Sequence, residues 1–139
     1  MYRKIIVAIV LGGIDKGEKI LRKAASLLDA GGEIIALNVV EDVPSYVAIE
    51  LPANMVEDAM KDSREQLEAL IAAAGVAATV EIRNGPPAKA IISAAESHGA
   101  DLIIVASHVP DFSNYFIGAT ADRVVRHAKC SVLVDRQKV

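Results

Sequence analysis

The chain has 139 residues, of which 53% are hydrophobic and 24% are charged, and its formal net charge is −3. This composition excludes a disordered chain, and the lack of Trp together with the negative charge argues against a nucleic-acid partner. The single cysteine, Cys130, excludes an internal disulfide and a multi-cysteine metal site.

Strand-like and helix-like segments alternate from the first residues onward. A continuous run of β-branched residues, 5–10, indicates a strand that is buried on both faces. Five strands are predicted, at residues 5–10, 34–40, 78–82, 102–106 and 132–134. Four helices are predicted between them, at residues 14–28, 54–74, 87–98 and 118–128. We expect Gly31 and Gly32 to end the first helix, and the capping-box spacing of Asn54 and Glu57 to begin the second.

This order predicts an α/β fold, made of a single doubly wound five-stranded parallel sheet with helices on both faces. We expect one domain that spans residues 1–139. In such sheets a ligand binds at the carboxyl ends of the strands, at the point where the strand order reverses. The loops after the first and fourth strands, residues 11–16 and 107–117, are therefore the expected site.

Nothing in the sequence indicates a membrane protein. The longest apolar stretch, residues 69–80, is shorter than the roughly 18 residues that a membrane span requires. No signal-peptide cleavage site follows the first apolar run. We therefore expect a cytoplasmic protein that has no membrane partner.

Candidate catalytic and cofactor motifs are weak. Gly12, Gly13 and Gly17 follow the first strand, but their spacing does not match G-x-G-x-x-G, so we interpret them as turn residues. Ser107 and His108 could act as nucleophile and base, yet neighbours in an extended segment point in opposite directions, and no third group is evident. We expect no catalytic residue, no metal and no enzyme activity, although weak ATP hydrolysis stays open as an alternative.

One segment that can bind an anion lies at the start of the last predicted helix. Gly118, Ala119 and Thr120 stand at a helix N-terminus, where free backbone N–H groups and the helix dipole attract an anion such as a phosphate. An ordinary loop and helix cap explains the same residues equally well.

Four stretches of the chain carry a resemblance to a known family. They are residues 4–9, 85–88, 100–108 and 118–134. Over essentially its full length the chain resembles the universal stress protein family, and its Ala-Ser-His-x-Pro-Asp loop is most similar to the bacterial F/G branch. The resemblance implies an adenine nucleotide alpha hydrolase-like fold and ATP or AMP as ligand. It also implies a homodimer, or a tetramer built from it, joined through the C-terminal strand at Val132 and Val134.

The resemblance also assigns a nucleotide-binding cleft. Its positions in this chain are Ala8, Val10, Val39, Ala106, Ser107, Val109, Gly118, Ala119 and Thr120. Val10 stands where many members have an aspartate against the ribose, and Ala119 stands where ATP-binding members have serine or threonine. Ala106 and Val109 replace two glycines of the ATP-binding pattern. Because losing a charged hydrogen-bond partner costs about 1.5–3 kcal/mol, we expect nucleotide binding to be weak.

The function expected from the sequence is that of a stress-response regulatory or protective protein with a partly degenerate ATP- or AMP-binding cleft. The main alternative is a dimerisation and interaction module that binds no nucleotide, because side-chain partners for the ribose and the phosphates are missing. A slow ATP hydrolase is less favoured, because the sequence offers no acidic pair or metal cluster that would activate water.

Overall fold

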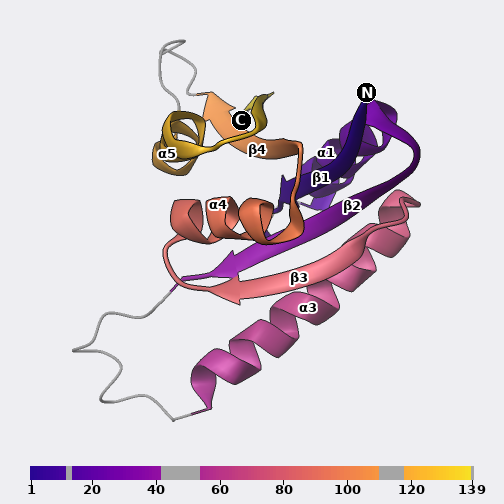
Figure 1. The fold of residues 1–139 in the computed structure, drawn as a ribbon. Coiled ribbons are helices and arrows are strands. Elements are labelled where there is room, and N and C mark those ends of the chain that lie inside the picture. The colour runs from indigo at the N-terminus through magenta and orange to yellow at the C-terminus, as the bar shows by residue number, and fades with distance from the viewer. Residues whose placement is uncertain (12–13, 42–53, 110–117, 139) are drawn as a thin grey trace.

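The computed structural model describes residues 1–11, 14–41, 54–109 and 118–138 (Figure 1). Its strands are β1 Tyr2–Ala8, β2 Leu28–Val40, β3 Thr79–Asn84, β4 Leu102–Val109 and β5 Ser131–Lys138. Its helices are α1 Ile14–Leu27, α3 Met55–Ala74, α4 Pro87–His98 and α5 Ala119–His127. None of these described helices is long and apolar enough to cross a membrane.

The five strands form one parallel sheet in the order β3-β2-β1-β4-β5. The chain builds the sheet outward from β1 to β3 and then continues on the other side of β1 with β4 and β5, so the order reverses between β1 and β4. Helices α1 and α3 pack on one face of the sheet, and α4 and α5 pack on the other (Figure 1). The predicted doubly wound α/β fold is therefore confirmed.

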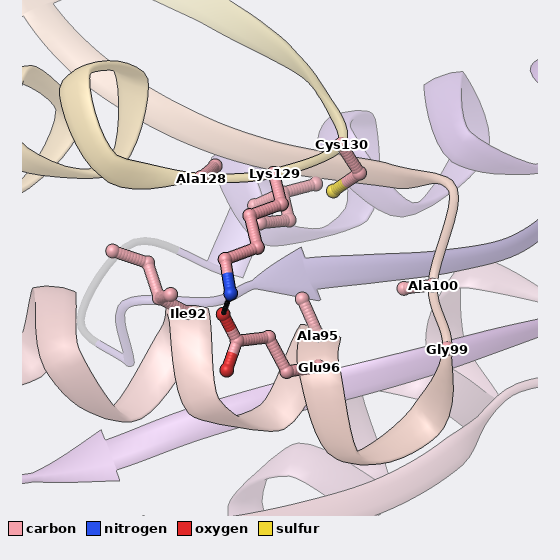
Figure 2. A pocket seen from close by; sticks show the side chains of 9 residues that line it. Ile92, Ala95, Glu96, Gly99, Ala100, Ala128, Lys129 and Cys130 are labelled. Carbon is pink, nitrogen blue, oxygen red and sulfur yellow. Dashed lines mark ion pairs between the residues drawn. The ribbon is translucent and has the colours of Figure 1, made fainter.

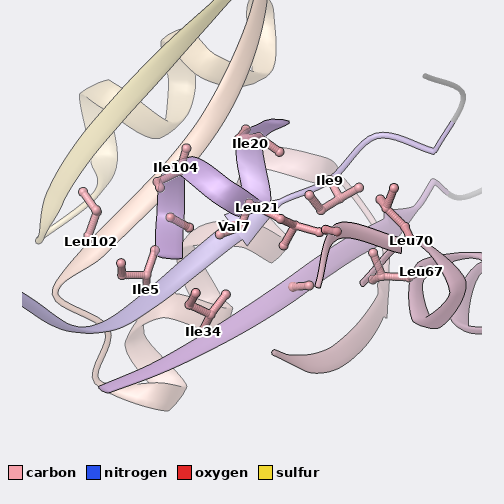
Figure 3. Packing of buried hydrophobic residues seen from close by; sticks show 13 residues of the cluster. Ile5, Val7, Ile9, Ile20, Leu21, Ile34, Leu67, Leu70, Leu102 and Ile104 are labelled. Atoms are coloured by element: carbon pink, nitrogen blue, oxygen red, sulfur yellow. The ribbon is translucent and has the colours of Figure 1, made fainter. Parts of the chain in front are cut away.

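Alternating side chains of the central strands fill two separate cores. Ile5 and Val7 of β1 point into the core beneath α1 and α3 (Figure 3), whereas Ile6 points into the core beneath α4 and α5. In β4, Ile104 and Ile103 divide between the two cores in the same way. Because both faces of these strands are buried, every position favours an apolar residue, which explains the continuous apolar runs in the sequence.

Gly17 lies inside α1, within the helix predicted at residues 14–28, so its interpretation as a turn residue is wrong. A Cβ atom at this position would lie 2.6 Å from Leu70 Cδ2 on α3. Glycine therefore lets the two helices approach closely, and this packing explains the residue better than turn geometry does. Gly12 and Gly13 lie outside the described residues.

The first helix ends at Leu27, before the two glycines that were expected to stop it. Gly31 and Gly32 lie instead within β2, which already begins at Leu28. A Cβ atom at Gly32 would lie 2.8 Å from the backbone oxygen of Arg3 and would obstruct the approach of β1. Gly32 thus allows close strand pairing, a role that the helix-stop interpretation missed.

Asp101 ties the beginnings of β1 and β4 together, at the end of the sheet opposite the expected site. Its carboxylate accepts the N–H of Arg3 at 2.9 Å and the N–H of Lys4 at 3.0 Å, and its own N–H donates to the Lys4 oxygen at 3.0 Å. These backbone donors favour the ionised form and hold the pKa of the Asp101 carboxyl below its ordinary value. Asp101 therefore stabilises the fold through hydrogen bonds that depend on its charge.

The variant Asp101→Asn is expected to be less stable than wild type at pH 7 by about 0.5–1.5 kcal/mol, because asparagine keeps one acceptor oxygen and loses one hydrogen bond. The exposed position favours the lower end of that range. Since the folded carboxyl has the lower pKa, its stabilisation is complete above the unfolded pKa, near pH 4, and is lost as the pH falls through the folded pKa. Urea unfolding of both proteins at neutral pH and at about pH 3 should therefore show the difference shrinking in acid.

A stability difference that stayed constant or grew toward acid would contradict this role of Asp101. The comparison is not disturbed by Glu81, whose pKa is also lowered, because both proteins contain that residue.

Candidate functional site

The candidate site lies at the carboxyl ends of β1 and β4, where the strand order reverses. Past the end of β1 the chain stays beside β2 for one more residue, since the N–H of Ile9 donates to the Leu37 oxygen at 2.8 Å. The side chain of Asn38 completes this link, because its Nδ2 donates to the Ile9 oxygen at 2.8 Å. Val10 then turns outward, with 73% of its surface exposed. The end of β1 is thus held by two hydrogen bonds, and the side chain that follows faces solvent.

Asn38 is a site residue that the sequence interpretation missed. It lies in β2 and is one of the few polar side chains that are buried in the described structure. A signal was present, because Asn38 is the only polar residue in the apolar run 34–40. Buried amides are almost always hydrogen-bonded, so an isolated asparagine near the end of a buried strand indicates a bond to a neighbouring strand end.

Ser107 joins the end of β4 to the start of α5. Its side chain is 2% exposed, and its Oγ accepts the N–H of Gly118 at 3.2 Å. The sequence interpretation counted the Gly118 N–H among the groups free to bind an anion, and this was wrong because Ser107 already occupies it. The N–H groups of Ala119 and Thr120 remain, and neither donates to any residue in the described part of the chain.

The surroundings of Ser107 also bear on its chemistry. The hydroxyl is enclosed and already accepts a hydrogen bond from the backbone, whereas a nucleophile must reach its substrate and lie beside a base. For His108 the structure describes the backbone of β4 but not the side chain. In this geometry Ser107 acts as a structural link that fixes where α5 begins.

The structure brings the other predicted cleft residues to the same edge of the sheet, but on two faces. Ala8 of β1 and Val39 of β2 pack against the core beneath α4 and α5. Ala106 of β4 packs against the opposite core, beneath α1 and α3. The side chain of Val109 lies outside the described residues, as do residues 110–117 of the loop that was expected to carry the site. Ala8 and Val39 therefore share the α4 and α5 face with Ser107, whose Oγ bonds to the start of α5, whereas Ala106 lies on the other face.

Backbone groups and small side chains dominate this edge of the sheet. None of the residues assigned to the cleft carries a charged side chain. Among the residues that the structure describes, no group of three or more His, Cys, Asp or Glu side chains is placed to hold a metal. Such a site can hold an anion on the first N–H groups of α5 and can contact an apolar ring at Val10. The arrangement suits binding better than proton transfer.

Comparison with known proteins identifies the family. A family model described as "Universal stress protein family" matches residues 1–136. Universal stress protein G of Shigella flexneri is 26% identical over 142 residues, which cover 98% of this chain and 100% of that relative. The solved structure of hypothetical protein MJ0577 matches with a TM-score of 0.78 at 21% identity and covers 100% of this chain and 99% of its own. A universal stress protein solved in complex with cAMP matches with a TM-score of 0.61 at 19% identity and covers 96% of each chain. The chain therefore belongs to the universal stress protein family.

Proposed function

We propose that the chain is a cytoplasmic stress-response protein, regulatory or protective, whose cleft binds ATP or AMP weakly. The observation that carries this proposal is the position of the α5 N-terminus at the end of β4, the neighbour of β1. Ser107 holds Gly118 there, which leaves the N–H groups of Ala119 and Thr120 for an anion. The phosphates then lie on α5, and the adenosine lies toward Val10.

Membership of the family supports a nucleotide ligand, since one relative of the same fold was solved in complex with cAMP. In this chain, however, Val10 provides no acceptor for the ribose hydroxyls and Ala119 provides no hydroxyl donor for a phosphate. Each missing neutral hydrogen bond weakens the binding free energy by about 0.5–1.5 kcal/mol, and each missing hydrogen bond to a charged group weakens it by more. Weak binding through backbone donors and apolar contacts is the consequence.

The proposed role is binding without catalysis. Ser107 is enclosed and engaged with Gly118, and the residues assigned to the cleft offer no charged group that could activate water. A slow ATP hydrolase is therefore the weaker alternative. An interaction module without any ligand is the stronger alternative, because the side chains of Val10 and Ala119 cannot form hydrogen bonds with the ribose or the phosphates.

A ligand titration tests the proposal and separates these alternatives. We expect ATP and AMP at millimolar concentration to raise Tm, whereas inorganic triphosphate, which lacks the adenosine, should raise it less. At a concentration tenfold above Kd the stabilisation is about 1.4 kcal/mol, which shifts Tm by several degrees in a chain of this length. Phosphate release should stay at the level of ATP in buffer.

Two results would overturn the proposal in different directions. If no nucleotide changed Tm, the chain would be an interaction module without a nucleotide ligand. If phosphate release rose in proportion to protein concentration, the chain would be an ATP hydrolase.

We also propose that the chain forms a homodimer through β5. Among the described strands, β5 has a partner strand on one side only, so the outer N–H and C=O groups of residues 131–135 are available to a second copy. Val132 and Val134 stand on one face of the strand and pack against the core beneath α4 and α5. An antiparallel pairing about a two-fold axis would bring both valines of one copy beside those of the other.

The charges on the two sheet edges favour β5 over β3. On β3, Glu81 accepts a hydrogen bond from Arg83 at 2.7 Å and lies 2.7 Å from His98 of α4, so the strand carries an ionic cluster (Glu81, Arg83 and His98). Charged groups on an edge strand oppose edge-to-edge pairing. The first half of β5, residues 131–134, carries no charge. Its first charged residue, Asp135, is paired with Lys23 of α1 in the same copy.

A further inference from the structure

A cavity lies on the α4 and α5 side of the sheet, far from the candidate nucleotide cleft. It opens between α4 and the segment that joins α5 to β5 (Figure 2), and its volume is about 130 Å³. Its apolar lining consists of Ile92, Ala95, Ala100, Ile103, Ala128 and Cys130. Ala100 lies two residues before β4 and Cys130 directly precedes β5, so the cavity lies at the amino ends of the strands. The nucleotide cleft lies at their carboxyl ends.

The cavity exists because small side chains meet there. Ala95 of α4, Ala100 before β4 and Ala128 after α5 line it from three directions, and none has atoms beyond Cβ to fill the space. The longer side chains of Ile92 and Ile103 form the remaining apolar wall. The cavity is not enclosed but opens to solvent on one side, so its apolar walls are surface that a small apolar ligand can cover.

The thiol of Cys130 belongs to this apolar wall. Its sulfur points toward the cavity (Figure 2), and burial raises the pKa of the Cys130 thiol above its ordinary value. At neutral pH the group is therefore an uncharged thiol, which is a weak hydrogen-bonding partner and behaves as a small apolar side chain.

The mouth of the cavity carries two opposite charges that neutralise each other. Lys129 Nζ lies 3.5 Å from Glu96 Oε1 across the opening (Figure 2). Both side chains are largely in solvent, with 83% and 50% of their surface exposed. A charged ligand would gain one partner and meet one like charge, so this mouth gives it no net attraction. An uncharged ligand can pass without breaking a strong interaction.

We propose that this cavity is a binding site for a small uncharged apolar molecule, of about the size of benzene or a short alkyl group. Its volume of about 130 Å³ is large enough for one such molecule, although its mouth is open to solvent, unlike the enclosed apolar cavities near 150 Å³ that bind benzene or xenon in other proteins. When the ligand enters the cavity, the apolar surface of the ligand and that of the cavity wall are both removed from water, and this drives binding. The site is separate from the nucleotide cleft, and either can exist without the other.

Benzene serves as the probe, and methyl NMR spectra of the isoleucines give the readout. We expect saturable shifts of the Ile92 and Ile103 methyl groups, and none at Ile20 or Ile34 in the core on the opposite face. Benzoate and benzylammonium have the same ring with a charge, and they should bind at least about tenfold more weakly. Benzoate binding as tightly as benzene would overturn the proposal, as would shifts that do not saturate or that spread to both cores.

Filling the cavity provides the matched test. Ala95→Leu places additional carbon atoms into the space and should weaken benzene binding by at least about tenfold, at some cost in stability because Ala95 is buried. Ala72→Leu makes the same change at an exposed position of α3 and should leave benzene binding unchanged. If Ala95→Leu does not fold, Ala128→Val fills the cavity from the other wall with less added volume. Unchanged benzene binding in a folded filling variant would overturn the proposal.

Discussion

Replacing Val134 by lysine is expected to convert the proposed homodimer into monomers at micromolar concentration. In an antiparallel β5 pair the two-fold axis repeats every contact, so one substitution removes two apolar contacts and places two like charges near each other. Val134 is already partly buried in its own copy, so each copy loses at most roughly 1.5 kcal/mol of apolar contact across the interface. Two such losses, together with the repulsion between the two lysines, raise the dimer Kd by about a hundredfold. Sedimentation equilibrium across a concentration series measures this change directly.

Val80→Lys is the matched control, because Val80 is a partly buried valine on β3, the other edge strand. Both variants lose apolar packing within one copy, so both should melt at lower temperature than wild type, but only Val134→Lys should dissociate the dimer. A monomeric wild type at micromolar concentration would refute the dimer. A dimer that survives Val134→Lys and is lost in Val80→Lys would place the interface on β3.

The fold was predictable because its signals are local and repeated. Buried parallel strands appear as continuous apolar runs, and helices between them follow the helical period. Strand ends were less predictable, because pairing can extend a strand beyond its apolar stretch. β5 was predicted at residues 132–134 but runs from Ser131 to Lys138, and its last residue pairs with Val109 of β4. Polar residues such as Asp135 and Arg136 hide this extension in the sequence.

The site was less predictable than the fold, because its decisive contacts join residues that are far apart in the sequence. The sequence analysis placed Ser107 in the loop after the fourth strand because of its position in the chain. Its burial and its hydrogen bond to Gly118 depend instead on where α5 packs. The bond from Asn38 to Ile9 depends in the same way on the register of β1 against β2. The exposure of Val10 also follows from three-dimensional placement, because the sequence shows it only as the last residue of an apolar run.

That exposure makes Val10→Asp an informative substitution. Because Val10 has 73% of its surface in solvent, an aspartate there stays hydrated, and the free energy of unfolding should change by no more than about 0.5 kcal/mol. If the ribose lies against this position, the new carboxylate accepts its hydroxyls. A hydrogen bond to a charged group contributes about 1.5–3 kcal/mol, so affinity for adenosine should rise by roughly ten- to a hundredfold.

Titration calorimetry with adenosine and with ATP distinguishes the two ends of the cleft. Val10→Asp should tighten both ligands alike, since both contain the ribose. Ala119→Ser adds a hydroxyl donor at the start of α5, so it should tighten ATP by up to about tenfold and leave adenosine unchanged. Val125 is also an exposed valine, but it lies on α5. Val125→Asp therefore controls for the added negative charge and should change neither the affinity for ATP nor that for adenosine. If Ala119→Ser improved adenosine as much as ATP, the phosphates would not lie on α5. If Val10→Asp weakened ATP but not adenosine, they would lie near β1 instead.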